Sequence, residues 1–275
     1  MTENFTAAAS YALEYAKGVL EGKTLAVLTG AGISTDSGIP DYRGEGRVAK
    51  HPMTFDNFIG SEAARVRYWA RSFVGWSRIA TAEPNAGHIA LALAEKNERV
   101  QQIITQNVDR LHQKAGAQRV IDLHGRLDMV KCVACGFELT RVEMDALLQL
   151  ANPGLEKDPN IEFTPDGDAE IEETTGFSVP SCPGCSGVLK PDVVFFGETV
   201  PEERVETAIR AVEQADALLV AGSSLAVNSG YRFAKLASKA GKPLVIINIG
   251  PTKADPLATV KLEVSCSLAL PELFA

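Results

Sequence analysis

Six short apolar runs, each followed by a turn and an amphipathic stretch, constrain the fold of this chain more than any other feature. This alternation is typical of parallel strands joined by crossover helices. The runs are continuously apolar, as strands buried on both faces are. They cover residues 24–29, 100–105, 120–123, 192–196, 217–221 and 244–249. We therefore predict an α/β fold with a doubly wound, mostly parallel Rossmann-like sheet, whose ligand lies beyond the carboxyl ends of the strands.

Two segments interrupt this alternation and predict a smaller lobe beside the sheet. Residues 44–84 have a helical pattern and several aromatic side chains, and residues 126–189 contain two cysteine pairs and an acidic stretch. We expect the first segment to be a helical module and the second a zinc-binding module. The Rossmann-like domain then comprises residues 1–43, 85–125 and 190–275. We expect a cleft between the two parts.

Four of the five cysteines form two C-x-x-C pairs, Cys132 with Cys135 and Cys182 with Cys185. Two such pairs commonly assemble four thiolates around one Zn²⁺ with no open position, which gives the metal a structural role. The 46 residues between Cys135 and Cys182 exceed the common zinc-ribbon spacing, so an insertion interrupts the module. A redox dithiol and a pair of loops without metal are the alternatives.

The charge of the chain is concentrated in that insertion. The formal net charge is -8, and residues 156–173 contain eight acids against one lysine, which leaves the rest close to neutral. A protein that mainly grips nucleic acid needs a basic face, so we expect no nucleic-acid partner. The acidic stretch could instead attract lysine-rich segments or close over a cleft, and a solvated loop is the alternative.

The chain shows no sign of export or of membrane association. No apolar run approaches the roughly 18 residues that span a bilayer. The first residues, 1–17, lack a basic head followed by an apolar stretch, so they match neither a signal peptide nor a typical transit peptide. We expect a cytoplasmic protein with no membrane partner.

A glycine-rich turn follows the first predicted strand. Gly30 and Gly32 match the first two glycines of a dinucleotide-binding fingerprint, and Thr35 replaces the third. Such a turn brings backbone N–H groups close to a pyrophosphate at a helix N-terminus. Ser34 and Ser37 add hydroxyl donors there. The alternative is a tight strand-to-helix turn without a ligand.

Two polar clusters, residues 105–112 and 122–125, follow the second and third predicted strands. Both should lie at the carboxyl edge of the sheet, where a cofactor would bind. His124 in the second cluster is followed by Gly125, which leaves space beside it. A histidine placed there is a candidate general base near neutral pH, although a structural role is the alternative.

Taken together, these motifs resemble those of the sirtuins, which are NAD-dependent protein-lysine deacylases. The resemblance covers nearly the whole chain from about residue 13. Besides the two cysteine pairs, it is carried by residues 30–43, 84–88, 105–112, 124–125, 189–198, 222–225 and 248–250.

Within this family the chain most resembles class II, the branch that includes one mitochondrial animal sirtuin. The class-like stretches are residues 67–76, 164–168, 229–233 and 248–251. That animal protein has an import presequence, and this chain shows none. The resemblance therefore implies a bacterial, cytoplasmic protein.

The resemblance also implies the role of each site residue. His124 would be the catalytic base, and Asn107 and Asp109 would order the nicotinamide pocket. Gln106 would hold the ribose on the nicotinamide side. The set implied to bind NAD is Gly30, Ala31, Gly32, Thr35, Asp41, Tyr42, Arg43, Gln106, Asn107, Asp109, Gly222, Ser223, Ser224, Asn248, Ile249, Gly250 and Cys266.

The implied reaction removes an acyl group from a lysine of a protein substrate. Its products would be free lysine, nicotinamide and O-acyl-ADP-ribose, and we expect the enzyme to act as a monomer. Protein mono-ADP-ribosyl transfer uses the same NAD-binding residues and stays open as an alternative. A Rossmann oxidoreductase would normally have a fuller glycine fingerprint and no four-cysteine module, and a zinc-ribbon nucleic-acid module conflicts with the acidic insertion.

The acyl group itself is open between two interpretations of Tyr68 and Arg71. They stand three residues apart in a predicted helix and so share a face. Their Y-x-x-R spacing resembles the pair that recognises succinyl- or malonyl-lysine in a neighbouring sirtuin class, which would favour acidic or longer acyl groups. The alternative is a surface arginine beside a tyrosine packed into the helical lobe.

Overall fold

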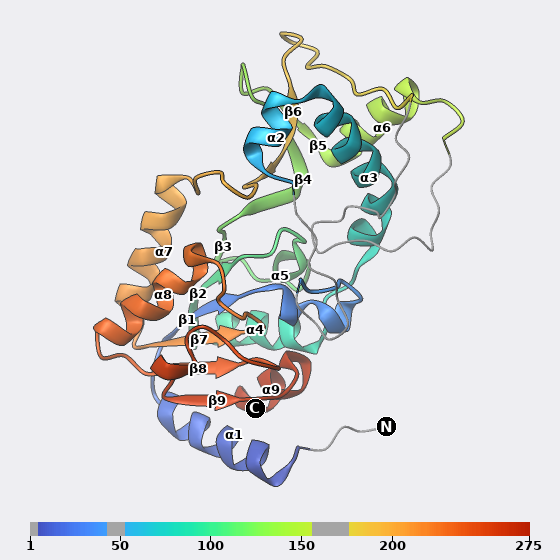
Figure 1. Cartoon of the computed structure of the whole chain (residues 1–275). Helices are drawn as coiled ribbons and strands as arrows, with labels where there is room; N and C mark the ends of the chain where they lie inside the picture. Colours follow the sequence, from blue (N-terminus) through green and yellow to red (C-terminus); the bar gives the residue numbers. More distant parts are fainter. Residues whose placement is uncertain (1–4, 43–52, 156–175) are drawn as a thin grey trace.

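The computed structural model describes residues 5–42, 53–155 and 176–275. Its larger sheet has six parallel strands in the order β3-β2-β1-β7-β8-β9, seen in the lower half of Figure 1. The order reverses beside β1, so the predicted doubly wound sheet is confirmed. The strands are β1 (Leu25–Thr29), β2 (Val100–Thr105), β3 (Val120–Asp122), β7 (Ala217–Ala221), β8 (Leu244–Ile247) and β9 (Val260–Leu262).

Helices cover both faces of this sheet because its strands are apolar on both sides. In β1, Leu25 and Val27 pack into the core beneath α1 (Ala7–Leu20), α4 (Ala86–Lys96) and α9 (Cys266–Leu273). Ala26 and Leu28 point the other way, into the core beneath α7 (Glu202–Gln214) and α8 (Asn228–Lys239). The continuous apolar pattern of the predicted strands is thereby explained.

A second sheet has three antiparallel strands in the order β5-β4-β6, and it corrects one prediction. These strands are β4 (Gly125–Cys132), β5 (Glu138–Thr140) and β6 (Leu189–Val193). The prediction that residues 192–196 form a parallel strand of the main sheet is wrong. Because Cys132 pairs with Leu189, the strands that lead to and from the two cysteine pairs run side by side in opposite directions.

Helices α2 (Phe55–Gly60), α3 (Glu62–Thr81) and α6 (Arg141–Ala151) pack with the second sheet around one core, in the upper half of Figure 1. Arg141 is buried in this core, with its guanidinium 5.7 Å from the ring centre of Trp69 and 5.1 Å from that of Trp76. Its amine groups donate to Asp145 and to the Ser72 carbonyl. The aromatic residues of α3 therefore serve packing.

Four shorter helices complete the described chain: η1 (Ala31–Ile33), η2 (Thr35–Ser37), α5 (Leu111–Lys114) and η3 (Asp255–Leu257). In the described ranges, no helix is long and apolar enough to cross a membrane. The division of the chain at residues 43, 84, 125 and 189 stays a prediction. Arg43, residues 44–52 and the whole acidic stretch, 156–173, lie outside the described residues.

Candidate active site

The loops after β1 and β7 touch at the point where the strand order reverses. Gly32 N–H donates to the Gly222 carbonyl at 2.8 Å, and Gly30 N–H donates to the Ala221 carbonyl at 3.2 Å. A Cβ on Gly222, whose φ is +65°, would lie 2.2 Å from the Ile33 nitrogen. The glycines thus allow two backbone loops to meet at the edge where doubly wound sheets bind ligands.

Two short 3₁₀-helices turn the chain away from β1 at this edge. The first, η1, begins at Ala31 and has no side-chain cap. Thr35 begins the second and is exposed, with its hydroxyl donating to the Gly32 carbonyl at 3.1 Å. Uncapped helix starts present N–H groups of the kind that bind phosphate. Because the Gly32 N–H is donated to Gly222, the donors that suit a pyrophosphate here are the N–H groups of Ala31, Thr35 and Asp36.

A buried polar network lies beneath these turns. Ser34 Oγ donates to Asp109 Oδ2 at 2.7 Å and accepts from Asn107 Nδ2 at 3.0 Å. The other oxygen of Asp109 accepts from the N–H of Leu111, which starts α5. Burial raises the pKa of the Asp109 carboxyl, and these hydrogen bonds oppose the rise. The network therefore fixes Asn107 and Asp109 together at the sheet edge.

Two buried histidines extend this network. His88 Nδ1 accepts from the Asn85 N–H in a capping box that starts α4, and its Nε2 lies 3.5 Å from Ser34 Oγ. His112 Nε2 lies 2.9 Å from Thr29 Oγ1. Burial lowers the pKa of His88 to about 4, and burial together with His88 lowers that of His112 well below its ordinary value. Both rings are therefore neutral at pH 7.

His124 lies at the same edge, two residues after the end of β3, and both of its ring nitrogens have partners. Nδ1 lies 3.1 Å from the Gln106 carbonyl oxygen, and Nε2 lies 2.8 Å from Ser229 Oγ. A carbonyl can only accept, so Nδ1 carries the proton and Nε2 is the basic nitrogen. Burial lowers the pKa of His124 below its ordinary value, which keeps the imidazole neutral and able to accept a proton.

Gln106 links the β1, β3 and β7 ends of the sheet. Its side-chain amide donates to the Thr29 carbonyl at 3.1 Å and to Ser223 Oγ at 2.8 Å. A Cβ on Gly230 would lie 2.4 Å from Gln106 Oε1, so the first turn of α8 packs directly on this amide.

The last residues of the set that the resemblance implies to bind NAD follow the ends of β7 and β8. Asn248 follows β8 and donates to the carbonyls of Ile249 and Gly250. Cys266 begins α9 and is buried, with Sγ 3.8 Å from the Ile247 carbonyl oxygen. Burial raises the pKa of its thiol to about 12, so it stays protonated. Gly222, Ser223 and Ser224 follow β7 directly.

Aromatic residues surround the segment that follows β6. The rings of Tyr42 and Phe196 contact edge to face, with centres 6.5 Å apart. Tyr68 is buried, with ring centres 5.4 Å from Phe58 and 5.3 Å from Phe195. The ring of Tyr68 therefore serves packing, whereas Arg71 is half-buried.

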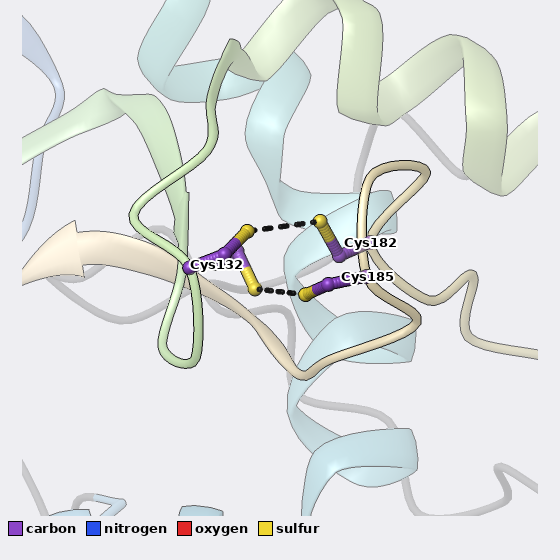
Figure 2. Close-up of side chains that lie close together, drawn as sticks. Cys132, Cys182 and Cys185 are labelled. Atoms are coloured by element: carbon purple, nitrogen blue, oxygen red, sulfur yellow. Dashed lines mark hydrogen bonds between the residues drawn. The ribbon is translucent and has the colours of Figure 1, made fainter.

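The four paired cysteines come together at the end of the second sheet, and Figure 2 shows their side chains converging. Their sulfurs all lie within 4.8 Å of one another, with Cys132 and Cys185 at 3.5 Å and Cys135 and Cys182 at 3.7 Å. Zinc–sulfur bonds of about 2.3 Å at tetrahedral angles place sulfurs about 3.8 Å apart. The cluster therefore fits one Zn²⁺.

A comparison with models of known protein families identifies the family of this chain. The model of the Sir2 family matches residues 30–229, from the first glycine of the β1 turn to Ser229 of α8. This chain belongs to the Sir2 family. The recognition of a sirtuin from sequence motifs is thereby confirmed, while its assignment to class II stays a prediction.

Close relatives in the Sir2 family come from bacteria. An NAD-dependent protein deacetylase of Xanthomonas campestris is 54% identical over 250 residues, covering 90% of this chain and 85% of that protein. Another, of Bordetella bronchiseptica, is 51% identical over 266 residues, covering 95% and 97%. Among solved structures, a Sir2 protein with a p53 peptide and NAD+ has a TM-score of 0.76 and 31% identity, covering 92% and 93%.

Some residues of this sirtuin site carry little sequence signal. Ser34 stands out only as one of three hydroxyls in the β1 turn, yet it joins His88, Asn107 and Asp109. Ser229, which contacts the His124 ring, is 105 residues away along the chain. A search for hydroxyl residues in the first turn of a helix that follows a strand would have listed it without singling it out.

Proposed function

We propose that this chain is an NAD-dependent protein deacetylase that converts acetyl-lysine and NAD to lysine, nicotinamide and O-acetyl-ADP-ribose. The observation that carries the proposal is His124, an oriented neutral imidazole at the ligand-binding edge of a Sir2-family sheet. The names of close relatives support the same activity.

In this proposal, NAD binds along the carboxyl edge between the β1 turn and the ends of β7 and β8. Ala31 and Thr35 lie at the uncapped helix starts that suit its pyrophosphate. Ser224 and Asn248, which follow β7 and β8, would contact the adenosine part. Asp41 and Tyr42 continue the same turn, with Tyr42 against Phe196.

NAD, when bound, supplies the ribose carbon and hydroxyls that receive the acyl group. His124 then acts through Nε2, which takes a proton from a ribose hydroxyl. Its Nδ1–H remains hydrogen-bonded to the Gln106 carbonyl during this step. Asn107 and Asp109 hold the nicotinamide side of the pocket through the Ser34 network. Because these groups are fixed before the substrate binds, little reorganisation is needed during the reaction.

Zinc in the four-cysteine cluster would have a structural role only. All four ligand positions are occupied by thiolates, so no position is open for substrate. The cluster joins the start of β6 to the end of β4, and β6 leads to Phe195 and Phe196.

For the acyl group, we propose acetyl as the main substrate, with acidic or longer acyl groups as a second candidate that rests on Arg71. The ring of Tyr68 packs against Phe58 and Phe195 in the core, whereas Arg71, about one helical turn away, is half-buried. A guanidinium in that position can pair with a carboxylate.

The class II branch, a cytoplasmic location and action as a monomer are also proposed. The stretch 229–233 supports the class, and its first residue contacts the proposed base. Four clustered thiols are suited to a reducing compartment, which supports the location. Size-exclusion chromatography with light scattering tests the monomer.

The decisive experiment incubates the purified protein with an acetyl-lysine peptide, with and without NAD. Peptide deacetylation that requires NAD and releases one nicotinamide per lysine supports the proposal. NAD labelled in its adenylate part separates the alternatives, because label in a small acetyl ester indicates deacetylation and label fixed on protein indicates ADP-ribosyl transfer. An NADH absorbance change would instead indicate an oxidoreductase.

A further inference from the structure

The hydroxyl of Ser229 lies against the basic nitrogen of His124. Ser229 is the second residue of α8, and its Oγ is 2.8 Å from Nε2. Because Nδ1–H is donated to the Gln106 carbonyl, the Ser229 hydroxyl is the donor to Nε2. A substrate hydroxyl that gives its proton to His124 must therefore reach the nitrogen that Ser229 occupies.

The same turn of α8 also supports the other side of the ring. Gly230 packs on the Gln106 side chain so closely that a Cβ would lie 2.4 Å from Oε1. The Gln106 amide is fixed by Thr29 and Ser223, and the backbone carbonyl of Gln106 accepts a hydrogen bond from Nδ1–H of His124. The first turn of α8 thus contacts Nε2 directly through Ser229 and supports the partner of Nδ1 through the packing of Gly230 on Gln106.

We propose that Ser229 is a positioning residue that holds His124 as its neutral Nδ1–H form and keeps Nε2 aimed into the site until a ribose hydroxyl replaces it. The proposal rests on the proposed function, since it needs His124 to be the base. Ser229 itself forms no covalent bond with the substrate and transfers no proton to it. It acts through the orientation and proton affinity of the imidazole.

The charges around His124 act in the same direction as Ser229. Burial lowers the pKa of His124 and Arg204 of α7 adds a repelling positive charge, while the hydrogen bond from Nδ1–H to the Gln106 carbonyl opposes this lowering. The N-terminus of α8 also presents the positive end of its dipole. A hydrogen bond donated to the neutral ring lowers the pKa further, so loss of the Ser229 hydroxyl should raise the pKa of His124.

The first test compares pH profiles of kcat/KM for the wild type, Ser229→Ala and Ser229→Thr. His124 must be neutral to act, so activity falls as the pH drops through its pKa. In Ser229→Ala this fall moves to higher pH. On the acid limb, at pH values below the pKa of His124 in both proteins, kcat/KM relative to its plateau drops by about threefold against the wild type, the expected size for one neutral hydrogen bond. Ser229→Thr keeps the hydroxyl and restores the profile.

The matched control is Ser238→Ala, which removes a serine hydroxyl near the other end of α8. We expect it to keep the wild-type profile. A Ser229→Ala profile that coincides with those of the wild type and Ser238→Ala overturns the proposal.

A second readout needs no activity. NMR of the protein with labelled histidine, with the His124 signal assigned from the His124→Gln variant, reports the tautomer and titration of this ring. We expect the Nδ1–H form in the wild type and titration at higher pH in Ser229→Ala. An unchanged titration, or an Nε2–H form in the wild type, overturns the inference. Absence of NAD-dependent deacetylation in the wild type would instead overturn the proposed function.

Discussion

The backbone N–H of Val194 donates a 2.8 Å hydrogen bond to the carbonyl of His124. Val194 directly follows β6, the strand that leaves the second cysteine pair, and His124 directly precedes β4, the strand that leads to the first. The smaller sheet is therefore attached to the proposed base itself. Changes in this sheet should affect catalysis as well as stability.

Gly125→Ala tests this attachment. Gly125 has a φ of +87°, and a Cβ there would lie 2.0 Å from the Asp192 carbonyl oxygen, so β4 and β6 must separate beside His124. We predict a loss of kcat/KM of about a hundredfold or more, because general-base catalysis depends on the placement of the imidazole.

The matched control for that variant is Gly136→Ala. Gly136 has a φ of +73° but no heavy atom within 4 Å of the added Cβ, so only backbone strain of about 1 kcal/mol is expected. Steady-state kinetics and chemical unfolding of both variants provide the measurement. Equal losses of activity in the two would contradict the account.

Zinc should be lost selectively from variants of the paired cysteines. We predict about one zinc per chain in the wild type and none in Cys132→Ser, since three thiolates leave the tetrahedral site incomplete. Cys132→Ser should also unfold at lower temperature. Metal analysis and calorimetry measure both effects.

Cys266→Ser provides the matched control, because Cys266 is the fifth cysteine and begins α9 far along the chain from the pairs. It should keep the full zinc content. Zinc retained by Cys132→Ser, or lost from Cys266→Ser, would show that the cluster has been assigned wrongly.

Much of the main sheet could be predicted because its strands are continuously apolar. The strands that sequence reasoning missed lack this signal: β9 has three residues, and β4 includes Arg126, Asp128 and Lys131. Residues 192–196 looked like a parallel strand because most of the run is apolar, but only Asp192 and Val193 lie in a strand, β6, which pairs antiparallel with β4. Pairing of this kind depends on long-range contacts and leaves no periodicity to detect.

The site was predictable where chemistry follows a strand end. His124, Asn107 and Asp109 come directly after predicted strands, so their meeting at one edge follows from the parallel sheet. The contact of Ser229 with His124 was not predictable, because the start of α8 approaches β3 only through the packing of the folded sheet. Family resemblance named the motif that contains Ser229 but gave it no role.

Arg71→Met tests the acyl preference. We predict that removal of succinyl and methylglutaryl groups falls about tenfold more than removal of acetyl, because an arginine lost from a carboxylate site removes a charge-assisted hydrogen bond. Tyr68→Phe should leave the ratio between acyl groups unchanged, since the ring packs against Phe58 and Phe195. Rates on a peptide panel provide the measurement, and equal losses in Arg71→Met would reject a carboxylate-reading role.

Acid should destabilise the protein through its buried histidines. The pKa of His88 is lowered to about 4 by burial, against about 6.5 in an unfolded chain, so the unfolded state binds more protons. The stability contributed by neutral His88 is complete above pH 6.5 and falls by about 3 kcal/mol as the pH drops to 4. His112 acts in the same direction, and Asp109, whose pKa is raised by burial, opposes them.

Urea unfolding at several pH values between 7.5 and 4.5 measures this dependence. His88→Gln should reduce the slope of the free energy of unfolding against pH, whatever its effect on stability at pH 7.5. An unchanged slope would show that His88 does not carry the acid sensitivity.

The central claim, that His124 is the base of an NAD-dependent deacetylase, is tested most directly by His124→Ala. The measurement is release of nicotinamide and of deacetylated peptide from one reaction containing NAD and an acetyl-lysine peptide. The account predicts equimolar release by the wild type and a loss of deacetylation of at least about a hundredfold in the variant, with its thermal unfolding little changed. Deacetylation by a folded His124→Ala protein at near wild-type rate would contradict it.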